Sequence, residues 1–135
     1  MDMEIVFPGG KRVDANYKSF TIKTDQSTFA GGENSAPAPF DYFLVSIGTC
    51  AGIYVLGFCQ QRNIPIDRIK IIQRLIRNEQ LKRIGTISLE IQLPPEFPEQ
   101  YKAAVIRSAE LCAVKKYMQN PPQFEIYTKV VDGSS

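Results

Sequence analysis

The residues that could do chemistry in this chain are its three cysteines, Cys50, Cys59 and Cys112. The sequence contains no histidine, which excludes Ser-His-Asp and Cys-His nucleophile pairs and histidine-ligated zinc or haem. No two cysteines form a CxxC pair, so a thiolate metal site has no support, and we expect neither a metal nor a cofactor. Any catalysis must therefore use cysteine, serine, tyrosine or charged side chains.

The start of the chain bears on the redox state of these cysteines. Residues 1–4 (MDME) place acids where a secretory signal would carry basic residues, and no apolar segment follows. We therefore expect a cytoplasmic protein. In that compartment, reduced thiols or a working redox pair are expected rather than a framework of structural disulfides.

Length and charge narrow the class of protein. A chain of 135 residues is typical of one domain, so we expect a single domain over residues 1–135. The net charge is only +2, whereas nucleic-acid binders usually carry a strong basic excess or a basic stripe. The small basic clusters at residues 82–83 and 115–116 are typical of solvated surface, and we expect no nucleic-acid partner.

Cys50 lies in the middle of the longest apolar stretch, residues 39–59. A membrane-spanning helix of about 20 residues is one interpretation, supported by the GxxxG pattern at residues 48–52. No other segment could span a bilayer, so we expect no membrane association and favour a core helix.

A helix that is apolar all round must be covered on every side. One small sheet covers only one face, so a second copy of the chain is needed for the other, and we predict a homodimer. The small residues at 48 and 50–52 would let the partner's backbone approach closely.

Residue periodicity predicts an α+β fold with mainly antiparallel strands around this helix. The helix should start at Pro39, where proline suits the first turn, and end near Arg62. A long loop, residues 25–38, precedes it, and loops of this length are often functional. The expected strands are residues 4–7, 11–15, 17–24, 67–77, 87–93 and 124–130. Two further helical stretches are expected, opening at residues 98–100 and covering residues 114–118.

Position alone does not make Cys50 reactive. A cysteine on an apolar helix usually acts as a small hydrophobic residue, and the same interpretation applies to Cys59.

Two stretches of the chain resemble the OsmC/Ohr family, which comprises osmotically inducible protein C and the organic hydroperoxide resistance proteins. The first stretch combines residues 34–41 (NSAPAPFD), 43–44 (FL) and 46–50 (SIGTC). The second is residues 110–116 (ELCAVKK), which resembles the family's second cysteine segment at the joint between two helices. The order of the expected elements agrees with the family along nearly the whole chain.

The resemblance implies an intertwined dimer, in which antiparallel sheets wrap around long central helices and the sites lie at the subunit interface. It also implies thiol peroxidase chemistry on organic hydroperoxides. The Cys50 thiolate would attack the peroxide and become a sulfenic acid, and Cys112 would condense with it to a disulfide. An external dithiol, of the lipoyl type or another thiol, would restore both cysteines.

The family stabilises its reactive thiolate with an arginine held by a carboxylate, and this chain offers several candidates. Arg12 is the best match for the arginine by its position after residues 9–10, and the adjacent Lys11 is the other basic residue there. An exposed hairpin charge is the alternative interpretation of Arg12. Asp41 stands where a glutamate is usual; an ideal helix would turn it away from Cys50, and its position also suits a structural role at the first helical turn. Glu33 in the loop is the rival carboxylate. Residue 113 is alanine where the family often has proline.

Two functional hypotheses remain open at this point. The first is a thiol-dependent peroxidase using Cys50 and Cys112. The second is a non-catalytic dimer that uses the same interfacial pocket to bind a small apolar or thiol-containing ligand.

Overall fold

The N-terminal part of the chain forms a three-stranded antiparallel sheet. The computed structural model describes residues 2–131 and 133. The strands are β1 (Glu4–Gly9), β2 (Arg12–Tyr17) and β3 (Phe20–Thr24). The predicted meander is thus confirmed, but β3 starts later than expected. Lys18 takes a φ of 54°, and such an angle ends one strand and turns the chain into the next.

The strand register gathers apolar residues on one face of this sheet. Ile5 lies opposite Ala15, which lies opposite Ile22, and Tyr17 lies opposite Phe20. Residues paired across antiparallel strands share a face, so these five residues form one apolar surface. Ile5 and Phe20 are 52% and 61% exposed, which leaves much of this surface uncovered in a single chain.

The loop after β3 is held in place by one buried carboxylate. Asp25 is 1% exposed, and its oxygens accept hydrogen bonds from the backbone N–H groups of Gln26, Glu33 and Ser35. The Ser35 hydroxyl donates a further bond of 2.6 Å. The bonds from Ser35, followed by that from Gln26, lower the pKa of Asp25 from 3.8 to about 2. The loop includes a short 3₁₀ helix, η1 (Thr28–Ala30), and leads directly into the long helix.

The apolar stretch forms α1 (Pro39–Gln61), close to the predicted bounds. Proline occupies its first turn, and the Asp41 carboxylate accepts the Ala38 N–H at 3.0 Å. The carboxylate thus satisfies one free amide and places a negative charge at the positive end of the helix dipole.

The helix α1 is buried on only part of its surface. Ile47, Ala51, Val55, Phe58 and Cys59 are buried, whereas Val45 and Ile53 on the other side are 56% and 59% exposed. Within the described residues, α1 alone is long and apolar enough to cross a membrane, and 28% of its most apolar window is buried. Core helices of soluble proteins pass the same test.

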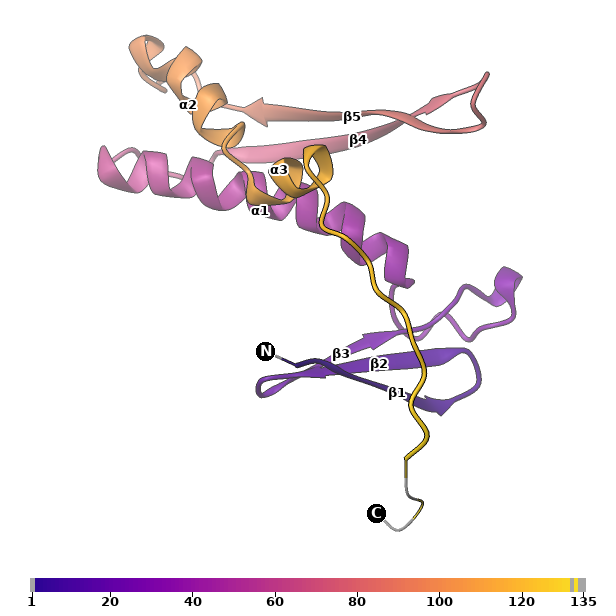
Figure 1. The fold of residues 1–135 in the computed structure, drawn as a ribbon. Coiled ribbons are helices and arrows are strands. Elements are labelled where there is room, and N and C mark those ends of the chain that lie inside the picture. The colour runs from indigo at the N-terminus through magenta and orange to yellow at the C-terminus, as the bar shows by residue number, and fades with distance from the viewer. Residues whose placement is uncertain (1, 132, 134–135) are drawn as a thin grey trace.

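A two-stranded hairpin, β4 (Lys70–Asn78) and β5 (Arg83–Gln92), packs along α1. In Figure 1 it lies above the helix, while the N-terminal sheet lies below the beginning of the helix. The side chain of Gln73 donates a hydrogen bond to the Leu44 carbonyl at 2.9 Å and occupies the space beside Gly48. Ile71 lies against Gly52, and Ala51 is fully buried.

These contacts correct one detail of the sequence interpretation. The small residues of α1 were expected to admit the backbone of a second copy. Instead, Gly48 and Gly52 face the chain's own strand β4. The prediction was wrong because a GxxxG pattern shows where another segment can come close, without showing whether that segment belongs to the same chain.

The C-terminal helices complete the core. The turn η2 (Glu99–Tyr101) leads into α2 (Lys102–Ala109), and α3 (Ala113–Gln119) follows after a short break. Val105 of α2 is fully buried in a cluster with Val55, Phe58 and Phe97. The described structure is therefore mixed helix and antiparallel sheet, which confirms the α+β prediction.

The expected last strand, residues 124–130, is absent from the described structure. The segment runs from α3 down past the level of the N-terminal sheet without forming a strand (Figure 1). Phe124, Ile126 and Val130 are 85%, 95% and 98% exposed. Strand-like alternation is present in these residues, but they pair with no strand within the described part of this chain.

Candidate active site

The structure brings Cys50 and Cys112 together where α1 meets the start of α3. Cys112 is the residue immediately before α3, and its Sγ lies 3.9 Å from the Ile47 carbonyl, one turn of α1 before Cys50. The thiol of Cys112 is also close enough to Cys50 to contribute to lowering the Cys50 pKa. Cys112 is 3% exposed, while Cys50 is half-buried. Two cysteines that lie far apart in the sequence are thus neighbours in space.

Backbone amides at the start of α3 stabilise the Cys50 thiolate. The N–H of Val114 is the main cause of a lowered Cys50 pKa, and the Cys112 thiol and the N–H of Ala113 act in the same direction. Burial opposes them, because an apolar surrounding disfavours the charged form. The first amides of a helix have no partner within the helix, which leaves them free to bind a thiolate.

Cys59 lies in different surroundings. It is fully buried in the core cluster, and burial raises the pKa of its thiol, an effect that nearby Arg62 partly offsets. The Arg62 guanidinium stacks 3.7 Å from the centre of the Phe58 ring and donates a bond to the Phe58 carbonyl. Cys59 is therefore held as a neutral core residue, in agreement with its sequence interpretation.

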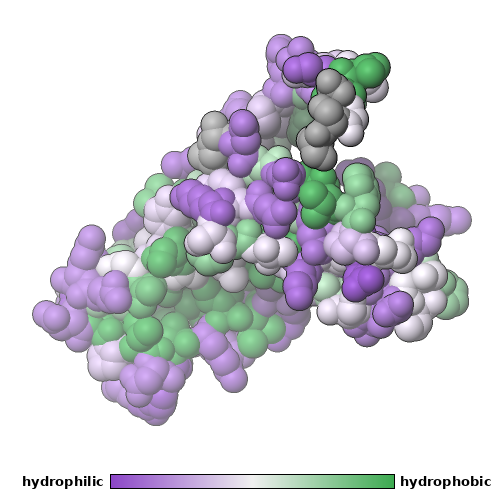
Figure 2. Space-filling model, turned by 90° about the horizontal axis from the view of Figure 1, so that it is seen from below, coloured by the Kyte–Doolittle hydropathy of each residue, from purple (hydrophilic) through white to green (hydrophobic). Residues whose placement is uncertain are grey.

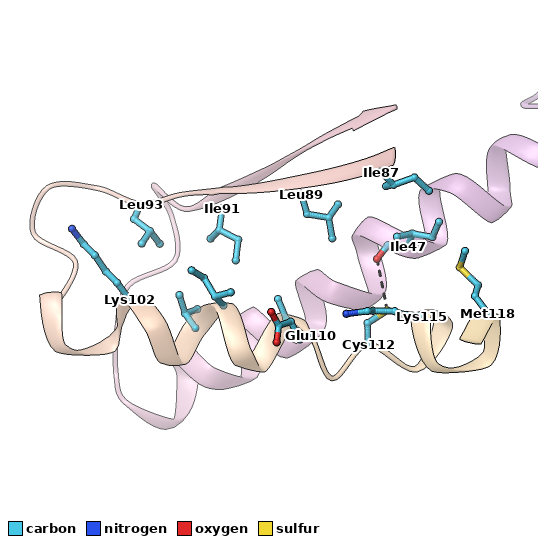
Figure 3. Close-up of a pocket in the computed structure, with 13 residues that line it drawn as sticks. Ile47, Ile87, Leu89, Ile91, Leu93, Lys102, Glu110, Cys112, Lys115 and Met118 are labelled. Carbon is cyan, nitrogen blue, oxygen red and sulfur yellow. Dashed lines mark hydrogen bonds between the residues drawn. The ribbon is translucent and has the colours of Figure 1, made fainter. Parts of the chain in front are cut away.

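A pocket of about 600 Å³ lies beside Cys112, between β5 and the C-terminal helices (Figure 3). Apolar side chains from β5 and the residue just after it project toward α2 and form one wall: Ile87, Leu89, Ile91 and Leu93. Lys102 lies at one end of the pocket, and Lys115 lies at the other end with Cys112 and Ile47 (Figure 3). The site thus combines a cysteine pair with a largely apolar cavity whose charged lining residues are Lys102, Lys115 and, between them, Glu110.

The other predicted site residues lie elsewhere in the single chain. Arg12 is exposed at the β1–β2 hairpin, where its Nε donates to the Gly9 carbonyl at 3.2 Å. Glu33 is exposed in the loop, and Asp41 caps the start of α1. None of these three side chains is among the groups that shift the Cys50 pKa within the described residues. Their roles at Cys50 remain predictions.

Sequence reasoning missed the amides of Ala113 and Val114 and the two lysines that line the pocket, Lys102 and Lys115. The sequence did contain a signal, because any residue that opens a helix has a free N–H group. Only the crossing of α1 and α3 shows that these groups face Cys50.

Comparisons with solved structures show the same fold in other proteins. A proposed osmotic-stress-induced and detoxification-response protein from Psychrobacter arcticus 273-4 aligns with a TM-score of 0.69 and 18% identity, over 84% of this chain and 85% of that one. A hypothetical protein from Aquifex aeolicus VF5 aligns with a TM-score of 0.61 and 18% identity, over 89% and 87%. The organic hydroperoxide resistance protein OsmC of Legionella pneumophila aligns with a TM-score of 0.51 and 14% identity, over 88% and 90%.

Sequence comparison identifies the family. A search of curated protein sequences finds no match. Residues 32–127 match the OsmC family, described as OsmC-like protein, and this region contains both α1 and the Cys112 segment. Since the match spans well over half of the chain and the fold agrees, the chain belongs to the OsmC family.

Proposed function

We propose that this protein is a thiol-dependent peroxidase that reduces organic hydroperoxides through Cys50 and Cys112. The observation that carries the proposal is the pair itself: a Cys50 thiol whose pKa is lowered, in part by a second thiol, that of Cys112. A low thiol pKa provides the thiolate that attacks peroxides, and an adjacent thiol allows the oxidised sulfur to be resolved. The family supports this substrate, because one structural relative is named an organic hydroperoxide resistance protein.

The reaction needs no other redox group. The Cys50 thiolate attacks the terminal peroxide oxygen, the O–O bond breaks, and the alkoxide leaves as an alcohol after taking up a proton. Cys50 is then a sulfenic acid. The Cys112 sulfur attacks it, the S–O bond breaks, water leaves and a disulfide forms. An external dithiol then takes up the two oxidising equivalents.

We also propose that the working unit is a cytoplasmic homodimer. Three apolar surfaces of the single chain support association: one face of the N-terminal sheet, the exposed side of α1, and residues 124–130. Figure 2 shows hydrophobic residues gathered in the left half of the view, where Figure 1 places the helices. Exposed apolar surface of this extent is unusual for a monomer. A second copy could also bring its Arg12, with Glu33 or Asp41, to Cys50.

Peroxide turnover by cysteine variants tests this proposal. Purified protein should consume cumene hydroperoxide when a dithiol is present. Cys50→Ser should abolish consumption, whereas Cys112→Ser should allow one turnover and leave an oxidised Cys50. Cys59→Ala is the matched control, because it removes a cysteine outside the site. Unchanged consumption in Cys50→Ser would refute the proposal.

The apolar pocket favours a second candidate, a non-catalytic dimer that binds a small apolar or thiol-containing ligand. The pH dependence of iodoacetamide labelling distinguishes the two. A Cys50 thiol that titrates well below the free value of about 8.5 supports the peroxidase. An inert thiol, together with a saturable rise in melting temperature on ligand addition, supports the binding protein.

A further inference from the structure

The positive charge of the chain is concentrated in the far half of the β4–β5 hairpin, residues 74–88, which we call the hairpin tip. The hairpin tip has four basic residues and one acidic residue, whereas the rest of the chain has twelve basic and thirteen acidic residues. All four basic side chains are exposed: Arg74, Arg77, Lys82 and Arg83. The small net charge of the whole chain therefore hides one basic surface and a slightly acidic remainder.

The cations of the hairpin tip are available to an external anion. Lys82 and Arg83 form no ion pair within the described part of the chain. Arg74 and Arg77 each lie 3.5 Å from a glutamate, in exposed pairs. Exposed pairs of this kind contribute little free energy, so an anion outside the protein can compete for these two arginines as well.

Aliphatic side chains lie among these cations. Leu75, Ile76 and Leu81 are 45%, 49% and 60% exposed. Leu81 lies in the turn, where Asn78 Oδ1 accepts the N–H groups of Gln80 and Leu81 at 3.0 and 2.9 Å. These bonds hold the turn in shape, and the turn projects beyond α1, away from the other elements (Figure 1). The hairpin tip thus presents a preformed surface that is both basic and aliphatic.

From this combination, we infer that the hairpin tip binds an anionic lipid surface. Anionic headgroups attract Lys and Arg, and the membrane interface accepts aliphatic side chains beside them. Leu81 enters the headgroup region, while Lys82 and Arg83 contact the lipid phosphates. The sequence prediction of no membrane association considered only a spanning helix, and this contact needs none.

A nucleic acid is the other polyanion that a basic hairpin could bind, but the side chains favour lipid. Proteins that bind single strands stack bases on aromatic side chains, and residues 70–92 contain no aromatic residue. Exposed leucine and isoleucine gain little from a hydrated phosphate backbone, whereas they gain from the membrane interface. The same tip on a second copy is also disfavoured, because both surfaces would be positively charged.

Sedimentation with vesicles tests the role of charge. Full-length protein is mixed with vesicles of equimolar phosphatidylcholine and phosphatidylglycerol, or of phosphatidylcholine alone. We expect binding to the anionic vesicles only, and weaker binding as salt is added. A Lys or Arg near an anionic surface changes the affinity about fivefold, so Lys82→Asn/Arg83→Gln should weaken binding about 25-fold. Asparagine suits the φ of 54° at Lys82. Arg107→Gln/Lys116→Gln removes the same charge from exposed positions of α2 and α3 and should bind as the unmodified protein does.

A single tryptophan tests insertion of the turn. The sequence contains no tryptophan, so Leu81→Trp introduces one fluorescent reporter. On anionic vesicles its emission should move to shorter wavelength and should be quenched by lipids brominated on their acyl chains. Phe29→Trp, at a fully exposed loop position outside the hairpin, is the matched control and should show neither change.

Several results would overturn the inference. These are equal binding to neutral vesicles, no binding to anionic vesicles, equal losses in the two charge variants, and unchanged emission of Leu81→Trp. Binding of a random-sequence DNA duplex without binding of vesicles would overturn it in favour of a nucleic-acid surface. Cys50 lies outside the hairpin, so Cys50→Ser should abolish peroxide consumption and leave vesicle binding unchanged. The inference and the peroxidase proposal can therefore fail separately.

Discussion

Replacing Ala113 with proline would test how the Cys50 thiolate is stabilised. Ala113 is the first residue of α3, and proline is well tolerated at that position. The preceding residue, Cys112, already has an extended backbone with ψ of 123°, as a residue before proline requires. Ala113→Pro therefore removes one N–H donor to Cys50 with little other change.

The expected effect follows from the strength of one hydrogen bond to a charged group, about 1.5–3 kcal/mol when the group is buried. Cys50 is only half-buried, so water partly replaces the lost donor, and we take about 1 kcal/mol. That energy corresponds to a thiolate population about fivefold lower below the titration midpoint. A more basic thiolate is also more nucleophilic, which reduces the net loss of alkylation rate to about two- to threefold.

The assay is iodoacetamide labelling of Cys50 at pH 6, followed by peptide mass spectrometry in the Cys59→Ala background. Thiolate absorbance at 240 nm gives the titration midpoint directly and should move to higher pH. Ala113→Gly, which keeps the N–H, is the control and should leave labelling unchanged. Identical rates for Ala113→Pro and Ala113→Gly would refute the stabilisation by α3 amides.

Three further predictions concern the scaffold. Asp25→Asn should lower the melting temperature at pH 7, because Asn accepts fewer hydrogen bonds from the loop amides than the carboxylate does. The Asp25 pKa falls from 3.8 in the unfolded chain to about 2 in the folded protein, so the carboxylate stabilises the fold above about pH 4. In thermal unfolding scans, the difference between the two proteins should vanish as the pH falls to about 2. Gly48→Ala places a methyl group against the Gln73 side-chain oxygen, which must move and lose its hydrogen bond to the Leu44 carbonyl, a loss of about 1 kcal/mol that the better helix propensity of alanine partly offsets. In a Gln73→Ala background the same substitution should be stabilising in urea titrations, whereas an equal effect in both backgrounds would contradict this contact. Ile53→Glu, at an exposed position of α1, should convert the dimer to monomers in analytical ultracentrifugation, whereas the control Gln60→Glu should not. A dimer unaffected by Ile53→Glu would show that this face of α1 is not the dimer interface.

The regular elements were readable from the sequence because their signals are local. Pro39 and the long apolar stretch predicted α1 almost to the residue, and the alternation of residues 87–93 predicted β5. The helix expected to open at residues 98–100 begins with the 3₁₀ turn η2 at Glu99–Tyr101 and continues as α2 from Lys102. Such elements depend on residue type and spacing within one segment.

The sequence failed where the outcome depends on which segments meet. Residues 124–130 alternate like a strand, but a strand also needs an edge to pair with, and the single chain provides none in its described part. Gly48 was assigned to a partner's backbone, while the space beside it belongs to Gln73, 25 residues further along the chain. The cysteine pair was predicted from the family motifs. Only the structure, in which α1 and α3 cross, shows that backbone amides of α3 stabilise the Cys50 thiolate.

The central claim is that Cys50 and Cys112 act as one redox pair on organic hydroperoxides. The most direct measurement is disulfide mapping by non-reducing mass spectrometry after reduced protein meets one equivalent of cumene hydroperoxide. The account predicts a Cys50–Cys112 disulfide within the first turnover, with Cys59 still a free thiol. A protein that stays fully reduced, or one in which Cys59 is oxidised first, would contradict it.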